Sequence, residues 1–402
     1  MNKKIVLGFS GGLDTSFCAK YLSEQGYDVH AVYVDTGGNT KEELEEIKNR
    51  AKQLGVKHQV VISCLVDYYE KIIKYLIFGN ILKNNTYPLS ASAERLIQSL
   101  YLVEYAEKVQ SEAIAHGSTG IGNDQVRFDM IIRVLASTIK IISPIRDLNI
   151  SREEEINYLK ERNIETNYIN ADYSINKGLW GTVIVGKETR TSHQYLPEFA
   201  WTTPVTRLEM QKVAIHFESG KIVGINNKHY EHPVEAITAL NDLAQPYGIG
   251  RGMHVDDTII GIKGRLAYEA AAATIIIQSH FYLEKHVLSK KQLIAKETIS
   301  NYYADWLYDG YILDPVMVDI ENYLETSQRN VTGTAYVELH PYYFTILGIE
   351  SKFDLMNTSV GQYGNTNKEL LAEELKGFSK IIGTPAYIYH SLRESLQSKG
   401  KI

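Results

Sequence analysis

The chain has few cysteines, no long apolar segment and no excess of basic residues. Among its 402 residues, Cys18 and Cys64 are too few for a disulfide framework or a cysteine-rich metal site, which suits a reducing compartment. The most apolar internal stretch, Ala270–Ile277, is far shorter than the roughly 20 residues that cross a membrane. The 42 Lys and Arg against 48 Asp and Glu give a net charge of −6, which argues against a nucleic-acid binder. We therefore expect a cytoplasmic protein with no membrane or nucleic-acid partner.

The first 165 residues alternate between strand and helix patterns. The short apolar runs Lys4–Phe9 and Val29–Val34 predict parallel strands that are buried on both faces. The segments Thr15–Gln25 and Lys41–Leu54 have helical spacing, and each is followed by a glycine that can end a helix. Such alternation is typical of an α/β fold with a doubly wound parallel sheet. Further strands are expected at 60–62, 112–115 and 139–142, and further helices at 92–108, 123–136 and 152–162.

The rest of the chain has an α+β pattern and divides into two parts. A hairpin is expected at 213–225, because Ser219 and Gly220 interrupt two strand-like runs. Near the end, Thr384 and Pro385 can begin a helix. That helix would carry an apolar stripe of Ile388, Leu392 and Leu396. The expected domains are 1–166, 167–376 and 377–402, with helices in the second at 233–243, 268–285, 290–308 and 316–327 and strands at 333–339 and 343–348.

A glycine-rich loop directly follows the first predicted strand and opens the first predicted helix. Its glycines allow a tight turn with bare N–H groups, its hydroxyls add donors, and the helix N-terminus favours an anion. Each helix-end interaction contributes roughly 0.3–1 kcal/mol, so several must converge to hold a phosphate chain. The loop lacks the lysine of a Walker A motif and is therefore a different kind of phosphate loop. Its residues are Gly8, Phe9, Ser10, Gly11, Gly12, Leu13, Asp14, Thr15 and Ser16.

A second glycine-rich block follows another predicted strand and also starts a helix. It offers a hydroxyl at Thr119, followed by the amide of Asn123, the carboxylate of Asp124 and the guanidinium of Arg127. A guanidinium can bind a carboxylate through two hydrogen bonds, and a carboxylate can accept hydrogen bonds from an ammonium group. These groups can hold amino acids by their charged ends, so the block predicts an amino-acid site.

The two motifs together resemble those of the argininosuccinate synthase family, which belongs to the N-type ATP pyrophosphatases. The resemblance spans most of the chain and is most specific in residues 5–35 and 113–130. It implies that ATP adenylates citrulline with release of pyrophosphate, and that aspartate then displaces AMP to give argininosuccinate in arginine biosynthesis. It also implies Mg²⁺ with the ATP, a nucleotide-binding domain followed by a citrulline-binding synthetase domain, and a homotetramer held by the C-terminal helices.

The resemblance assigns the site position by position. ATP is expected at the loop from Gly8 to Ser16, at Val34 and at Gly117. Aspartate is expected at Thr119, Asn123 and Asp124. No residue is assigned as a general base or a metal ligand, and the twelve histidines show no metal-binding spacing. The residues expected to bind citrulline are Tyr87, Ser92, Asn123, Arg127, Ser174, Val183, Asp256 and Tyr268.

The chain departs from the commoner family pattern on the amino-acid side of the site. Asp256 is one methylene shorter than the usual Glu, and Val183 stands where a hydroxyl residue often binds citrulline. Asn176 and Gly178 stand where Asp and Asn are usual, and the residues after Tyr268 also differ. We therefore expect a divergent branch of the family, in which the amino-acid substrate could have changed.

Three alternatives remain at the level of sequence. One is a related adenylating ligase that acts on another amino acid. A second is a tRNA-modifying adenylase, which the net charge of −6 and the isolated Cys18 and Cys64 disfavour. The third is a non-catalytic ATP sensor, which would not need Asn123, Asp124 and Arg127 beside the nucleotide.

Overall fold

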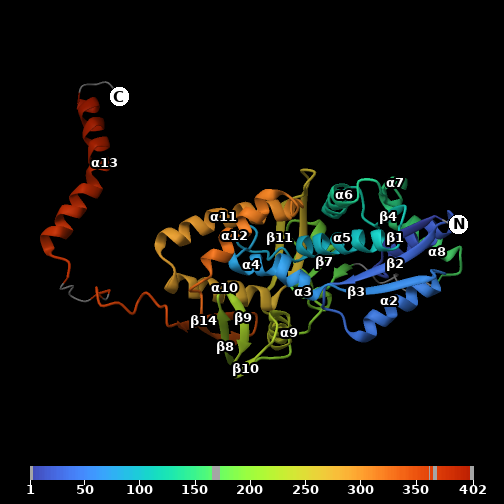
Figure 1. Cartoon of the computed structure of the whole chain (residues 1–402), viewed down its shortest axis with the longest axis horizontal. Coiled ribbons are helices and arrows are strands. Elements are labelled where there is room, and N and C mark those ends of the chain that lie inside the picture. Colours follow the sequence, from blue (N-terminus) through green and yellow to red (C-terminus); the bar gives the residue numbers. More distant parts are fainter. Residues whose placement is uncertain (1–2, 165–172, 362, 365–368, 399–402) are drawn as a thin grey trace. The chain divides into compact units, whose positions relative to one another are not determined.

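The computed structural model describes residues 3–164, 173–361, 363–364 and 369–398 (Figure 1). The chain forms one compact unit up to Phe353 and a second from Asp354 onward. The expected boundary between residues 166 and 167 lies outside the described residues. In the described part of the chain, no helix is both long enough and apolar enough to cross a membrane.

A five-stranded parallel sheet lies in the N-terminal half, in the order β3-β2-β1-β4-β5. The chain runs outward from β1 to β3 and then continues on the other side of β1, so the strand order reverses between β1 and β4. This arrangement confirms the doubly wound α/β prediction. The strands are β1 Lys4–Gly8, β2 Asp28–Asp35, β3 His58–Ser63, β4 Ala113–Ala115 and β5 Lys140–Ile142.

Helices cover both faces of this sheet. Helix α5 packs on one face against β1 and β2, whereas α1 packs on the other face together with α8. Capping boxes fix the starts of α2 and α8, where Thr40 and Ser151 each exchange hydrogen bonds with a glutamate three residues on. The helices are α1 Leu13–Glu24, α2 Lys41–Gln53, α5 Ser90–Lys108, α6 Asn123–Leu135, α7 Pro144–Leu148 and α8 Arg152–Lys160. The sequence did not predict a further helical stretch, which comprises α3 Leu65–Tyr68, a π-helical turn Tyr69–Ile73 and α4 Lys74–Phe78.

Two antiparallel sheets form the rest of this unit. The first has the order β11-β12-β7-β6, and the second has the order β10-β9-β8-β13-β14 with α9 and α10 packed on it. The strands are β6 Tyr173–Asn176, β7 Thr182–Gly186, β8 Gln211–Glu218, β9 Lys221–Ile225, β10 Lys228–His229, β11 Arg251–Asp257, β12 Lys263–Glu269, β13 Gly333–His340 and β14 Tyr343–Glu350. The helices are α9 Pro233–Ala244, α10 Ala271–Val287, α11 Lys290–Asp309 and α12 Pro315–Ser327.

The structure confirms the α+β pattern but corrects one helix boundary. The hairpin β8–β9 turns at Ser219 and Gly220 as expected. The helix expected to start at Tyr268 starts instead at Ala271, because Tyr268 pairs with Gly252 and Val183 inside the sheet.

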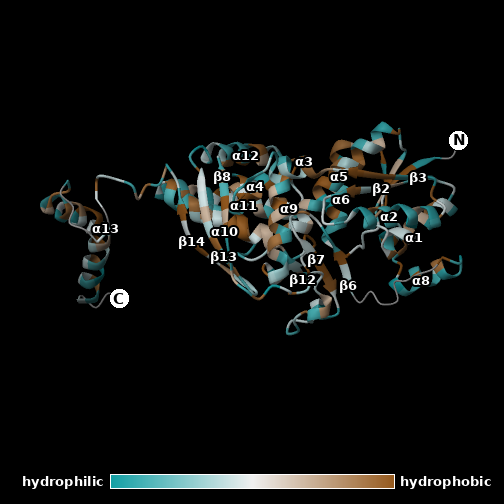
Figure 2. Cartoon of the chain, turned by 90° about the horizontal axis from the view of Figure 1, so that it is seen from below, coloured by the Kyte–Doolittle hydropathy of each residue, from teal (hydrophilic) through white to brown (hydrophobic). Residues whose placement is uncertain are grey.

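One hydrophobic core joins the two halves of the first unit. It includes Val6 and Val32 from the parallel sheet and, in the same cluster, Ile276 from α10 and Val337 from β13. In Figure 2 the hydrophobic residues gather in the interior strands and helices, whereas the outer helix α8 is largely hydrophilic. The helices and sheets that hold the two sequence motifs therefore belong to one packed body.

The second unit contains the helix α13, Ala372–Ser398. The expectation that Thr384 and Pro385 begin this helix is wrong, because Pro385 lies inside it. The helix begins earlier, where the N–H of Leu371 donates to the carboxylate of Glu374 at 2.8 Å. The predicted stripe of Ile388, Leu392 and Leu396 lies in its second half.

Candidate active site

The two glycine-rich motifs open at the same edge of the parallel sheet. The first follows β1 and leads into α1, and the second follows β4 and leads into α6. Strands β1 and β4 are hydrogen-bonded neighbours, with Leu7 beside Ala115. This is the point where the strand order reverses, and ligands of open α/β sheets bind there, at the carboxyl ends of the strands.

The first loop presents hydroxyl and N–H donors around a tight turn. Gly11 has a φ of +76°, a conformation that favours glycine. The Ser10 and Thr15 hydroxyl oxygens lie 3.2 Å apart, and the N–H of Gly12 donates to Ser10 Oγ at 3.4 Å. The N-cap residue of α1 is Gly12, which has no side chain to cap the helix, and an uncapped helix N-terminus favours an anion.

The second loop packs directly on the first. A Cβ atom at Gly117 would lie 3.2 Å from Thr15 Cγ2 and 3.4 Å from Asp14 Cβ, so a side chain there would push the loops apart. Val34, which is also expected near the nucleotide, is buried near the end of β2. Arg50 of α2 also reaches this region and donates from Nε to Ser16 Oγ at 3.4 Å.

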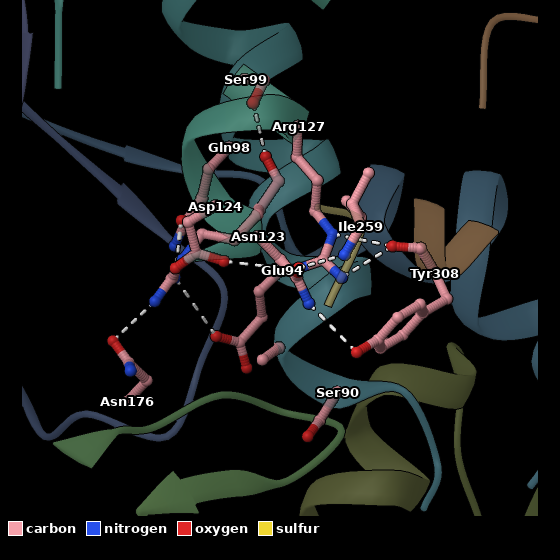
Figure 3. A network of polar contacts seen from close by, with 12 residues as sticks. Ser90, Glu94, Gln98, Ser99, Asn123, Asp124, Arg127, Asn176, Ile259 and Tyr308 are labelled. Atoms are coloured by element: carbon pink, nitrogen blue, oxygen red, sulfur yellow. Dashed lines mark hydrogen bonds and ion pairs between the residues drawn. The ribbon is translucent and has the colours of Figure 1, made fainter. Parts of the chain in front are cut away.

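The second motif contributes a carboxylate held between two guanidinium groups (Figure 3). Arg95 Nε donates to Asp124 Oδ2 at 2.9 Å, and Arg127 Nη1 donates to Asp124 Oδ1 at 3.2 Å. Arg95 also donates to Asn176 Oδ1 at 2.7 Å. Burial opposes the ionisation of Asp124, but the two arginines outweigh it and hold its pKa below the ordinary value. Asp124 is therefore ionised and can accept hydrogen bonds from an ammonium group.

The rest of this motif is fixed by the C-terminal half of the unit. Arg127 donates to the carbonyl of Tyr308 from Nε at 3.0 Å and from Nη2 at 2.6 Å. Asn123 donates to the Tyr308 hydroxyl at 3.0 Å and accepts from the N–H of Ile259 at 2.8 Å (Figure 3). Tyr308 in turn donates to the carbonyl of Asp257 at 3.1 Å. Elements far apart in the sequence thus hold the side chains in place.

Glu94 is a buried residue of this site that sequence reasoning missed. Its side chain is 2 % exposed, its Oε2 lies 3.8 Å from Arg95 Nη1, and its Oε1 has no hydrogen-bond partner among the described residues. A Cβ atom at Gly178 would overlap Glu94 Oε1, so Glu94 fills the space that a side chain at position 178 would need. Burial raises the pKa of Glu94 to about 7, although Arg95 favours the charged form.

An aromatic cluster lies beside the network. Tyr87 stacks on His254 with ring centroids 4.9 Å apart and lies 5.3 Å from the Tyr268 ring. Asp256 Oδ2 lies 3.6 Å from Lys83 Nζ and 3.7 Å from His254 Nε2. The structure therefore brings together Tyr87, Tyr268 and Asp256, and adds Lys83 and His254, for which the sequence gave no signal.

The remaining predicted residues lie in several environments. Ser92 is buried on α5, and Thr119 is exposed in the second loop. Ser174 is exposed on β6. Val183 is buried on β7, where it pairs with Asn176 on one side and Tyr268 on the other. The residue that replaces the family's usual hydroxyl is therefore an apolar side chain buried at the sheet.

Comparisons with known proteins identify the class of nucleotide-binding fold and the family. Residues 4–165 match the family described as arginosuccinate synthase N-terminal HUP domain, the class of nucleotide-binding fold that the switch point and phosphate loop indicate. Residues 173–389 match the family described as arginosuccinate synthase C-terminal domain. The chain belongs to the argininosuccinate synthase family.

Relatives of the same name align over nearly their whole length. The argininosuccinate synthase of Methanocaldococcus jannaschii is 39% identical over 97% of this chain and 98% of its own. That of Xylella fastidiosa is 36% identical over 99% of this chain and 100% of its own. That of Dictyoglomus thermophilum is 37% identical over 96% of this chain and 97% of its own.

Proposed function

We propose that this protein condenses L-citrulline and L-aspartate to argininosuccinate, with ATP converted to AMP and pyrophosphate, as a step of arginine biosynthesis. One observation carries the proposal. A phosphate loop rich in hydroxyl and N–H donors packs through Gly117 and Thr15 on a block that presents an ionised carboxylate and a guanidinium. The first half suits a triphosphate, and the second suits amino acids held by their charged ends.

The reaction proceeds in two displacements. The ureido oxygen of citrulline attacks the α-phosphorus of ATP, the bond to the bridging oxygen breaks, and pyrophosphate leaves. The α-amino group of aspartate then attacks the ureido carbon of citrullyl-AMP, AMP leaves with the former ureido oxygen, and the amine loses a proton. The donors of the loop stabilise the charge that develops on the departing pyrophosphate. Holding the two substrates in the correct orientation can lower the activation barrier by roughly 7–11 kcal/mol.

The residues divide between the substrates as follows. The loop from Gly8 to Ser16, with Val34 and Gly117, would hold ATP as its Mg²⁺ complex. Thr119, Asn123 and Asp124 would hold aspartate. The residues proposed for citrulline are Tyr87, Ser92, Asn123, Arg127, Ser174, Val183, Asp256 and Tyr268, of which Val183 can offer only an apolar contact.

The organisation of the chain follows from this assignment. Residues 1–166 would bind the nucleotide, residues 167–376 would complete the citrulline site, and α13 would join subunits in a homotetramer. The apolar stripe of Ile388, Leu392 and Leu396 on α13 supports such an assembly. The enzyme would act in the cytoplasm, where its three small-molecule substrates are available.

Omission of single substrates tests the proposal. We expect pyrophosphate release with ATP, citrulline and aspartate together, and a loss of release when citrulline or ATP is left out. Release that does not depend on citrulline would contradict the assignment. If citrulline is inert and another amino acid supports release, the enzyme is a related ligase. If no AMP forms after long incubation with both amino acids, the protein is an ATP-binding sensor.

A further inference from the structure

Three potential metal ligands meet at the amino-terminal edge of the parallel sheet, away from the carboxyl ends where the phosphate loop lies. Asp28 and His58 are the first residues of β2 and β3, and His30 is the third residue of β2. One ligand atom from each of the three side chains lies within 4.8 Å of the others. Within the described part of the chain, this is the one group of three or more such side chains with that spacing.

The sheet itself brings the three side chains to one face. Residues two apart on a strand point the same way, so Asp28 and His30 share a face of β2. His30 is the register partner of His58 on the neighbouring parallel strand, and their rings stack with centroids 4.2 Å apart. Strand pairing therefore fixes the positions of the three residues. The two rings must turn out of their near-parallel stack before both can bind one ion, because a ring nitrogen binds a metal in the plane of its ring.

One of the three distances between ligand atoms is close to that in a tetrahedral metal site. Ligands bonded at about 2.0–2.1 Å to a tetrahedral ion lie roughly 3.4 Å from each other. His58 Nε2 lies 3.6 Å from Asp28 Oδ1, close to that value. Two imidazoles and one carboxylate form a donor set that zinc-like ions bind, with water in the fourth position.

The central histidine is prepared to act as a ligand. His30 is 6 % exposed, and its Nε2 is buried without a hydrogen-bond partner among the described residues. Its Nδ1 lies 3.1 Å from the Tyr105 hydroxyl, so one ring nitrogen is held and the other is left for an ion.

One charged group opposes an ion at this position. Lys4 of β1 neighbours Asp28 in the strand register and carries a positive charge. Its ammonium group donates to the carbonyl of Val109 at 3.0 Å, which holds it at the end of α5. The carboxylate of Asp28 is the group that would offset the charge of a bound cation.

We propose that Asp28, His30 and His58 form a binding site for a zinc-like divalent transition-metal ion, with Tyr105 as a positioning residue. The ion would join β2 to β3 at the edge of the sheet opposite the phosphate loop. This inference does not rest on the proposed function, and its test does not measure turnover.

Cobalt binding to the full-length protein tests the site. After treatment with a chelator and its removal, we expect one equivalent of Co²⁺ to produce the visible absorption of a four-coordinate complex, and Zn²⁺ to displace it. The variants Asp28→Asn and His58→Gln change partly or fully exposed side chains, and each should weaken Co²⁺ binding at least tenfold. His193→Gln changes an exposed histidine outside the cluster and should bind Co²⁺ as the wild type does.

A second pair of variants tests the positioning role. Tyr105→Phe should weaken Co²⁺ binding by about tenfold, the lower end of the usual effect of removing a hydrogen-bond partner from a liganding histidine. Tyr101→Phe, one turn earlier on α5, should leave binding unchanged. The proposal is overturned if Co²⁺ gives no visible absorption with the wild type. It is equally overturned if Asp28→Asn and His58→Gln bind Co²⁺ as tightly as His193→Gln.

Discussion

Glu94 places a carboxyl group in the protein interior beside Arg95 and Asp124. Burial raises its pKa from 4.5 to about 7, so the protonated form prevails below pH 7 and the protein must hold a buried charge above it. A carboxyl whose pKa is raised on folding favours the folded state at low pH, and that contribution is lost as the pH rises to 7.

Glu94→Gln tests this ionisation. The amide resembles the protonated acid, so the variant should gain stability over the wild type as the pH rises from 5 to 7 and then stay level. The gain should reach at most about 3 kcal/mol, since each pKa unit corresponds to about 1.36 kcal/mol. Urea unfolding at pH 5, 6, 7 and 8 measures it, with Glu104→Gln on the exposed side of α5 as a control. A stability difference that does not vary with pH would contradict the account.

Gly178 and Glu94 should behave as a pair. In Gly178→Ala the new methyl group would overlap Glu94 Oε1, and we expect a loss of about 1–3 kcal/mol in unfolding free energy. Glu94→Ala in the same chain should restore most of it, because the space becomes free. Chemical denaturation of the two single variants and the double variant gives the coupling free energy. Additive effects would show that the two residues do not compete for this space.

At the scale of elements, the loop between β1 and α1 should bind ATP through its hydroxyl groups. Thr15→Val keeps the shape of the side chain but removes Oγ1, which lies 3.2 Å from Ser10 Oγ. We expect the KM for ATP to rise about tenfold, since hydrogen bonds to charged groups contribute roughly 1.5–3 kcal/mol. The KM for citrulline should stay within twofold, and Thr298→Val on the exposed face of α11 should change neither. Equal increases in both KM values would contradict a specific role in ATP binding.

The parallel sheet could be predicted from sequence because each of its strands is a short apolar run followed by a helical pattern. Strands β6 and β7 could not, since no clear period marks the residues on either side of Trp180. Pro385 indicated a helix start because proline is common there, yet acids in the first turn already start α13 at Ala372.

The candidate site likewise has parts that could be predicted from the sequence and parts that could not. Each of the two loops is a continuous stretch of sequence and could be recognised. Glu94 and Gly178, in contrast, meet only when α5 packs under the segment between β6 and β7. The group formed by Asp28, His30 and His58 likewise depends on the pairing of β2 with β3. Contacts between distant segments are set by packing, and the spacing of residues along one chain does not reveal them.

At the scale of the whole molecule, a shared hydrophobic core holds the two halves of the site together. A single hydrophobic cluster joins the parallel sheet to α10 and β13, so the phosphate loop and the amino-acid block are held in one body. This arrangement explains how Tyr308, near the end of α11, fixes both Asn123 and Arg127.

The proposed tetramer depends on the stripe along α13. Ile388→Asp with Leu392→Asp places two charges on that stripe, and we expect the assembly to fall from tetramers to smaller species. His390→Asp lies about 200° around the helix from either residue and should leave the tetramer intact. Mass photometry of the three full-length proteins gives the distribution. A tetramer that survives the double substitution would contradict the role of the stripe.

The fate of the ureido oxygen tests the central claim most directly. Citrulline labelled with ¹⁸O at the ureido group is incubated with ATP and aspartate, and the products are analysed by mass spectrometry. If the ureido oxygen attacks the α-phosphorus, one ¹⁸O atom appears in each AMP and none appears in pyrophosphate. Label found in pyrophosphate or inorganic phosphate, or unlabelled AMP formed together with argininosuccinate, would contradict the proposed chemistry.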